Sequence, residues 1–186
     1  RKPWRRSAVQ GDALVLIGMP GCGKSTLGRH LARRYRKPFI DVDDVLMAQE
    51  NKSIRKLALE HSYHEFVRLE EKAACSIKTE QSVIATGGSV VYSPRSMDHM
   101  QRLGTVVYLC KPFQETRRRA GNPKRRGIVI PPGETYDTYQ EERHRLYRRY
   151  ADIIFMTKDK SVQESLMYLT GLLEFIDPEN FKPIYF

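Results

Sequence analysis

Short apolar runs alternate along the chain with stretches of helical periodicity. The runs are bounded by glycine or polar residues, which is typical of strands buried inside a parallel sheet. Strands are predicted at 13–17, 82–86, 105–109 and 152–156, with a fifth within 38–44. Leu27, Leu31 and Tyr35 share one face of a predicted helix over 24–35, and an amphipathic helix fits 162–176. Strands that alternate with helices predict an α/β fold, with a five-stranded parallel sheet covered by helices on both faces.

Two further stretches modify this simple alternation. Residues 53–77 predict two helices, and their expected inward positions are Leu57, Phe66, Leu69, Ala73 and Ile77. The stretch 121–137 is rich in glycine, proline and arginine. We therefore expect a mobile lid at about 121–137 rather than a regular element.

Length and composition indicate one globular domain. The chain has 186 residues, of which 40% are hydrophobic. We divide it into a basic N-terminal arm (1–12), a main domain (13–176) and a C-terminal extension (177–186). No apolar run approaches the roughly 20 residues that span a bilayer, so we expect no membrane partner. Three scattered cysteines suit reduced thiols, and we expect a cytoplasmic protein.

The formal net charge of +10 raises the hypothesis of a nucleic-acid-binding protein. The sequence lacks a basic-aromatic RNA-binding motif, a zinc finger and a clear helix-turn-helix. Much of the excess arginine is concentrated in 117–127 and 142–150, where it suits a small anionic ligand. We therefore do not expect a nucleic-acid partner, and we expect the chain to act as a monomer.

The stretch GMPGCGKST (18–26) follows the first predicted strand and opens the first predicted helix. Gly18, Gly23, Lys24 and Ser25 fit the phosphate-binding pattern G-x-x-x-x-G-K-[ST]. Glycines let backbone N–H groups turn inward around phosphates, and the helix N-terminus adds its positive dipole end. Lys24 is expected to reach the β- and γ-phosphates, and Ser25 to ligate Mg²⁺. The expected nucleotide-binding residues of this loop are Gly21, Cys22, Gly23, Lys24, Ser25 and Thr26. The motif predicts ATP or GTP and does not identify the phosphoryl acceptor.

Residues at the ends of two predicted strands are candidates for the acceptor site, because ligands gather at the carboxyl ends of parallel strands. On an extended chain Asp41 and Asp43 point the same way, and they could serve Mg²⁺ through water or accept a hydroxyl proton. Alternatively, one aspartate of this stretch caps the next helix, a role for which we favour Asp44. Gly87 and Gly88 allow close approach of a ligand, or form a plain turn.

Two arginines are candidates for charge stabilisation. Arg126, in the lid, is placed to close over the γ-phosphate, and Arg143 could pair bidentately with a substrate carboxylate. Each of them could instead be a solvated surface arginine.

The segments LIGMPGCGKSTLGRHLA, FIDVDD, ATGGSVV, VVYL and ERHRLYRRYAD resemble, in order, segments of shikimate kinases. The resemblance runs from about residue 13 to 175. It implies a three-layer P-loop kinase with an arginine-bearing lid, which transfers the γ-phosphate of ATP to a ring hydroxyl of shikimate. In that family Asp41 would support Mg²⁺ through water, and Asp43 would bind the substrate hydroxyls and act as the candidate base.

The resemblance also assigns the arginines and the paired glycines. Arg119 matches an arginine that stacks on adenine, Arg126 matches the lid arginine, and Arg143 matches an arginine that binds the shikimate carboxylate. Gly87 and Gly88 match the first two of three family glycines. Catalysis would accordingly depend on Lys24, Asp43 and Arg126.

The acceptor half of the family pattern contains departures. Val67 stands where the family usually has a second carboxylate-binding arginine, and Arg68 is turned about 100° from it around a helix. Ser89 stands at the third glycine, and Arg145 replaces a proline. Either Arg68 or Arg145 compensates, or the acceptor is another small hydroxy acid such as homoserine.

Three hypotheses therefore stay open. Shikimate is the default acceptor, and homoserine or a similar hydroxy amino acid is the alternative. A nucleotide-binding regulatory module without catalysis is a third possibility, although the retained chemical residues argue against it.

Overall fold

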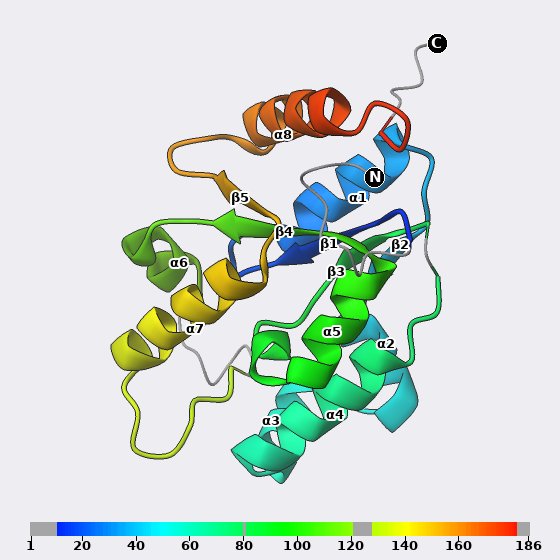
Figure 1. Cartoon of the computed structure of the whole chain (residues 1–186). Helices are drawn as coiled ribbons and strands as arrows, with labels where there is room; N and C mark the ends of the chain where they lie inside the picture. The colour runs from blue at the N-terminus through cyan, green and yellow to red at the C-terminus, as the bar shows by residue number, and fades with distance from the viewer. Residues whose placement is uncertain (1–10, 80, 121–127, 182–186) are drawn as a thin grey trace.

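The computed structural model describes residues 11–79, 81–120 and 128–181, which form a three-layer α/β fold (Figure 1). Five parallel strands make one sheet in the order β2-β3-β1-β4-β5, which confirms the predicted fold class. The strands are β1 (Ala13–Ile17), β2 (Phe39–Asp41), β3 (Val83–Ala85), β4 (Gly104–Cys110) and β5 (Ile153–Met156). The helices are α1 (Lys24–Arg34), α2 (Val42–Glu50), α3 (Ile54–Glu60), α4 (Tyr63–Cys75), α5 (Pro94–Leu103), α6 (Phe113–Ala120), α7 (Tyr136–Tyr150) and α8 (Val162–Ile176), with a short 3₁₀ turn η1 (Val90–Tyr92).

Strand β1 lies at the centre of the sheet and contributes to two separate hydrophobic cores. Ala13, Val15 and Ile17 point into the core formed with α4, α5 and α7. Leu14 and Leu16 point into the opposite core, which α1 and α8 cover (Figure 1). All five side chains are fully buried. Burial on both faces explains why this strand is a continuous apolar run rather than an alternating one.

The two helices predicted within 53–77 are present as α3 and α4. Leu57, Phe66, Ala73 and Ile77 are buried as predicted, and Leu69 is half-buried. Helix α5 was not predicted, although Pro94 occupies its first turn and the Ser93 side chain caps it.

The expected helix cap in the stretch 41–44 was wrong. Asp41, not Asp44, caps α2, because its side chain accepts a hydrogen bond from the backbone N–H of Asp43. Strand β2 ends at Asp41, so Asp43 already lies in the first helical turn and Asp44 is exposed on that helix. The spacing of Asp41 and Asp43 had suggested that both lie on one extended chain, and this expectation was therefore wrong.

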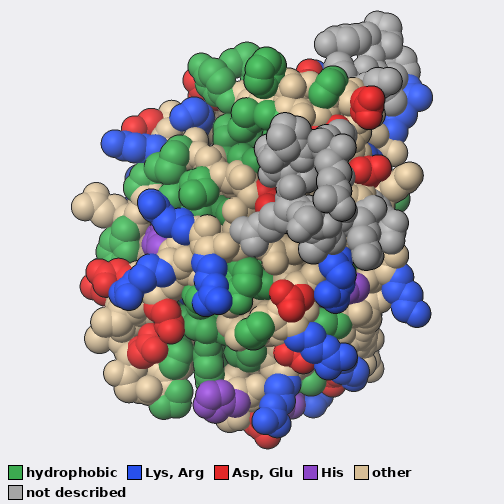
Figure 2. Space-filling model, viewed as in Figure 1, with side chains coloured by type: hydrophobic (Ala, Val, Ile, Leu, Met, Phe, Trp, Pro, Cys, Tyr) green, Lys and Arg blue, Asp and Glu red, His purple; other side chains and the backbone are tan. Residues whose placement is uncertain are grey.

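The surface carries charges of both signs, together with an apolar region. Figure 2 shows lysine and arginine side chains interspersed with acidic ones on one face, and hydrophobic side chains gathered at the top, over α8. The exposed apolar residues of that helix include Met167, Tyr168, Leu172 and Phe175. Within residues 11–79, 81–120 and 128–181, no helix is long and apolar enough to cross a membrane. Phe181, in the predicted C-terminal extension, is fully buried, with its ring centroid 5.2 Å from that of Tyr35.

Candidate active site

The loop between β1 and α1 has the backbone geometry that its glycines allow. Gly18, Gly21 and Gly23 adopt φ angles of 147°, 81° and 104°, which L side chains rarely adopt. A Cβ at Gly18 would also lie 2.8 Å from the carbonyl oxygen of Leu109. Gly23 occupies the N-cap position of α1 and supplies no side-chain cap. The first N–H groups of α1 are therefore placed to bind an anion.

Lys24 begins α1 and lies over this loop. Its side chain is buried, and Nζ donates hydrogen bonds to the carbonyl oxygens of Gly18 (2.8 Å) and Met19 (3.1 Å). These bonds hold the ammonium group above the loop. The predicted phosphate-binding lysine therefore lies where a phosphate cradled by the loop would meet it.

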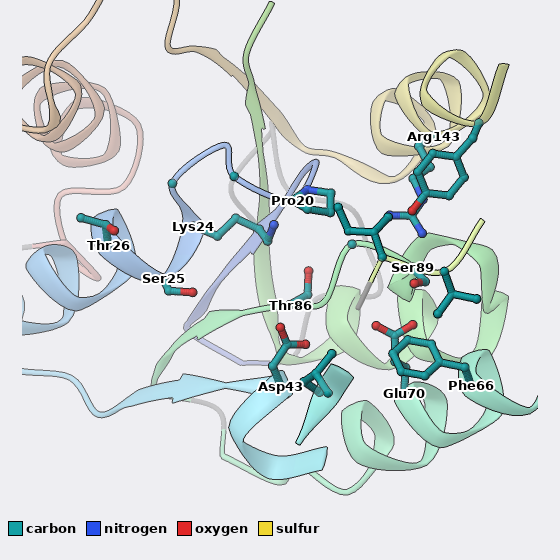
Figure 3. A pocket seen from close by; sticks show the side chains of 17 residues that line it. Pro20, Lys24, Ser25, Thr26, Asp43, Phe66, Glu70, Thr86, Ser89 and Arg143 are labelled. Carbon is teal, nitrogen blue, oxygen red and sulfur yellow. The ribbon is translucent and has the colours of Figure 1, made fainter. Parts of the chain in front are cut away.

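A cavity of about 650 Å³ extends from this loop toward α4 and α7 (Figure 3). Its nucleotide end is lined by Pro20, Gly21, Gly23, Lys24, Ser25 and Thr26. Its opposite end, here called the acceptor end, is lined by Asp43, Ile54, Phe66, Glu70, Thr86, Gly88, Ser89, Ile128, Val129, Tyr139 and Arg143. The fold thus brings the predicted residues Lys24, Ser25, Asp43, Gly88 and Arg143 to one cavity.

Other predicted site residues lie outside the lining or outside the described chain. Cys22 is buried beneath the loop, with its sulfur on the side of Gly18. Gly87 is buried behind the lining next to Glu70. Arg126 and the side chain of Arg119 lie outside the described residues, so their predicted roles at the γ-phosphate and the adenine stay predictions.

Ser25 and Asp41 form the candidate metal-binding pair. The Ser25 hydroxyl donates a 2.6 Å hydrogen bond to Oδ2 of Asp41. Oxygen ligands of this kind suit Mg²⁺, which keeps several waters and binds through one or two carboxylates together with substrate phosphates. Within the described chain, no cluster of three or more His, Cys, Asp or Glu residues could hold a metal. The oxygens of Ser25 and Asp41 fit a magnesium ion whose other ligands would be phosphate and water.

Asp43 lies beside this pair, at the start of the acceptor end. Burial and the neighbouring charge of Asp41 raise its pKa to about 6, although the Lys24 ammonium acts in the opposite direction. A carboxylate with a pKa closer to neutrality accepts a proton from a hydroxyl more readily. Asp43 is therefore suited to the predicted role of base.

Glu70 is a residue of the acceptor end that the sequence prediction missed. It is 5% exposed, and burial raises its pKa to about 7. Oε2 has no hydrogen-bond partner among the described residues. Glu70 lies at helical spacing from Phe66, Ala73 and Ile77, which were predicted to point inward. A charged residue on this inward face was the signal in the sequence that could have identified Glu70 as a site residue.

Arg143, from α7, forms the far wall of the acceptor end. It is 1% exposed, and its guanidinium carbon lies 4.0 Å from the ring centroid of Tyr139 and 5.3 Å from that of Tyr92. Its Nε and Nη2 have no hydrogen-bond partner within the described chain. Arginine remains charged at physiological pH, so this buried guanidinium offers donors to an anionic ligand.

The two arginines considered as replacements do not reach the cavity. Arg68 and Arg145 are both exposed, and neither lines it. Arg143 is the only arginine among the described lining residues. The proposed compensation is therefore absent from the described part of the acceptor end.

Glycine is needed at positions 87 and 88 because neighbouring side chains approach the backbone closely, not because the backbone angles require it. A Cβ at Gly87 would clash with Oε1 of Glu70 and lie 3.0 Å from Oδ1 of Asp43. A Cβ at Gly88 would lie 2.5 Å from Nη1 of Arg143. The Tyr147 hydroxyl donates a 2.7 Å hydrogen bond to the Gly88 carbonyl oxygen and so fixes this turn. The glycine pair thus allows three charged side chains to meet at the acceptor end.

Comparison with known proteins identifies close relatives. The family model "Shikimate kinase" matches residues 20–174. A shikimate kinase of Paracidovorax citrulli is 36% identical over 168 residues, which cover 87% of this chain and 92% of that protein. The crystal structure of shikimate kinase from Aquifex aeolicus matches with a TM-score of 0.75 at 29% identity, covering 87% of this chain and 96% of that one. A shikimate kinase from Acinetobacter baumannii, solved in complex with shikimate, shares the fold with a TM-score of 0.75 at 24% identity, covering 93% and 96% of the two chains.

Proposed function

Because this chain belongs to the shikimate kinase family, we propose that it transfers the γ-phosphate of ATP to a hydroxyl group of shikimate. Its family makes it a small-molecule kinase. The observation that carries the proposed acceptor is the single cavity that joins Lys24 and Ser25 to Asp43 and Arg143. One end of this cavity suits a nucleoside triphosphate, and the other suits a small hydroxy acid.

The nucleotide end supplies the phosphoryl donor. The N–H groups at the start of α1 and the Lys24 ammonium would hold the β- and γ-phosphates. Ser25 and Asp41 would hold Mg²⁺, which neutralises charge on the phosphates when it is bound. The position of Lys24, with its ammonium above the loop, supports this assignment.

The acceptor end would position the hydroxyl. The unpaired Nε and Nη2 of Arg143 would bind the shikimate carboxylate in a bidentate pair. Asp43 would accept the hydroxyl proton while the hydroxyl oxygen forms a bond to the γ-phosphorus. The bond from that phosphorus to the β–γ bridging oxygen breaks, and ADP leaves.

The test is ADP release with ATP and Mg²⁺ in the presence of shikimate, homoserine and other small hydroxy acids. Turnover with shikimate, and its loss in Lys24→Ala, is the expected result. Turnover with homoserine but not with shikimate would overturn the proposal that shikimate is the acceptor, whereas the proposed phosphoryl transfer from ATP would still hold. No turnover with any acceptor would favour a nucleotide-binding module.

A further inference from the structure

Glu70 and Ser89 face each other across the acceptor end of the cavity. Both side chains line it, with exposed fractions of 5% each, and the Ser89 hydroxyl points toward the Glu70 carboxylate (Figure 3). Glu70 comes from α4, whereas Ser89 follows the Gly87–Gly88 turn after β3. The two residues are therefore brought together only by the packing of α4 against this turn.

We propose that Ser89 is a positioning residue: its hydroxyl holds the Glu70 carboxylate so that the free Oε2 receives a hydrogen-bond donor of the acceptor. The proposal rests on the proposed function, because it concerns the acceptor of the same site. It requires the acceptor to carry a hydroxyl or ammonium donor in addition to the carboxylate that Arg143 takes.

A buried carboxylate requires such support. Moving a carboxylate out of water is costly unless it is paired or hydrogen-bonded. Among the described residues, no lysine or arginine forms an ion pair with Glu70. The charged groups that face Glu70 are Asp43 from α2, Lys24 from α1 and Arg143 from α7. A hydrogen bond from the Ser89 hydroxyl would favour the charged carboxylate of Glu70, as do the charges of Lys24 and Arg143, whereas the charge of Asp43 opposes it.

Val67, Ser89 and Arg145 depart from the family pattern, and of these Ser89 lines the acceptor end of the cavity. Val67, at the position where the family usually has arginine, does not line the cavity. Ser89, at the position of the third family glycine, contributes a hydroxyl that glycine cannot supply. Among the described residues, this end of the cavity is lined by one guanidinium and by a serine hydroxyl beside the buried carboxylate.

The kinetic test compares Ser89→Ala and Ser89→Gly with the unaltered chain. We expect the KM for the acceptor to rise about tenfold at pH 7, because a hydrogen bond to a charged group is lost. The KM for ATP should stay unchanged. The acid limb of the pH profile of kcat/KM should also move to higher pH, which a loss of packing alone would not cause. A wild-type acceptor KM together with an unmoved acid limb would overturn the proposal.

Ser96→Ala is the matched control. Ser96 is a fully buried serine of α5 that lies outside the cavity lining, and its hydroxyl has no hydrogen-bond partner among the described residues. Its removal should leave both the acceptor KM and the pH profile unchanged. A change in Ser96→Ala equal to that in Ser89→Ala would overturn the specific role of Ser89.

A second measurement needs no acceptor and so separates this proposal from the proposed function. The carboxyl carbon of Glu70 is followed by NMR titration and assigned through Glu70→Gln. Its titration midpoint should move to higher pH in Ser89→Ala and stay in place in Ser96→Ala. An unmoved midpoint in Ser89→Ala would overturn the proposal even if shikimate is turned over. If the enzyme does not turn over shikimate, the kinetic test is carried out with the acceptor that the panel identifies. The chemical structure of that acceptor then shows whether a hydroxyl or an ammonium group is available to donate to Glu70.

Discussion

The hydroxyl of Ser25 donates a 2.6 Å hydrogen bond to Oδ2 of Asp41, whose Oδ1 accepts the backbone N–H of Asp43 at 3.2 Å. One carboxylate therefore joins the start of α1, the end of β2 and the first turn of α2. Asp41 is at once a helix cap and a neighbour of the proposed Mg²⁺ ligand. The two roles can be separated experimentally because asparagine is also a good cap.

Asp41→Asn should impair the use of Mg²⁺ while it preserves the fold. The neutral amide still caps α2 but loses the negative charge that would support the cation. We expect the Mg²⁺ concentration for half-maximal activity to rise at least about tenfold, as measured by ADP release over a Mg²⁺ series. Asp44→Asn is the control, since Asp44 is exposed on the same helix turn. A normal Mg²⁺ dependence in Asp41→Asn would contradict this assignment.

Arg143→Met should weaken acceptor binding selectively. Methionine keeps apolar contact with Tyr139 but removes the donors that would bind the carboxylate. The loss of a charge-assisted contact costs roughly 1.5–3 kcal/mol, so the KM for shikimate should rise about ten- to a hundredfold. Initial rates at varied shikimate and at varied ATP separate the two substrates. Arg145→Met, at an exposed position two residues along α7, should leave both KM values unchanged. Equal effects of the two variants would show that Arg143 has no special role.

Gly88→Ala should disturb the acceptor end without unfolding the chain. The new Cβ would lie 2.5 Å from Nη1 of Arg143 and 3.0 Å from Cδ of Pro20, and the guanidinium can be displaced. We expect a rise of about tenfold or more in the KM for shikimate, with a small change in Tm. Gly171→Ala in α8 is a contrasting control, because nothing lies within 4 Å of the added methyl group. It should stabilise the protein by about 1 kcal/mol, since alanine is the better helix former. An unchanged shikimate KM in Gly88→Ala would argue against close contact at this turn.

Glu70 should make stability fall as pH rises from mildly acidic to neutral. Its pKa in the folded chain is raised to about 7 from an ordinary value of 4.5, mainly by burial, so the folded state binds the proton more tightly than the unfolded state. This contribution is fully present below pH 4.5 and is lost as pH rises through about 7. It amounts to on the order of 3 kcal/mol. Urea unfolding at pH 5 and pH 8 should therefore show a smaller loss of stability in Glu70→Gln than in the unaltered chain. An equal loss in both would remove Glu70 as the cause.

The sequence predicted the parts of the fold that local patterns determine. Strand β1 is a continuous apolar run because both its faces are buried, and the glycines of the loop are required by their backbone angles. These signals lie within a few residues of one another. The order of the strands was not predicted, whereas the family resemblance assigned Asp43, Gly88 and Arg143 to one substrate site.

The remaining features depend on contacts between segments far apart in the sequence. The predictions that Asp41 and Asp43 share an extended chain and that Asp44 is the cap were both wrong, because strand β2 ends at Asp41 and Asp41 caps α2. In the sequence Glu70 resembles a solvated charge within a polar helix, whereas in the fold the Gly87–Gly88 turn packs against it and helps to bury its carboxylate. Whether Arg68 or Arg145 reaches the cavity likewise depends on side-chain directions that sequence spacing does not determine.

The alternation of β1 between two cores determines where substitutions can be tolerated. The phosphate-binding loop follows a strand whose every side chain is fixed by one core or the other, so mutations there disturb the whole domain. The acceptor end is lined by residues of α2, α3, α4 and α7, by the turn after β3 and by residues 128–129, and its apolar side chains belong to one core. Substitutions at the acceptor end therefore affect one core rather than both. The architecture thus lets substitutions at the acceptor end alter the fit to the acceptor while the phosphate-binding loop and its strand stay intact.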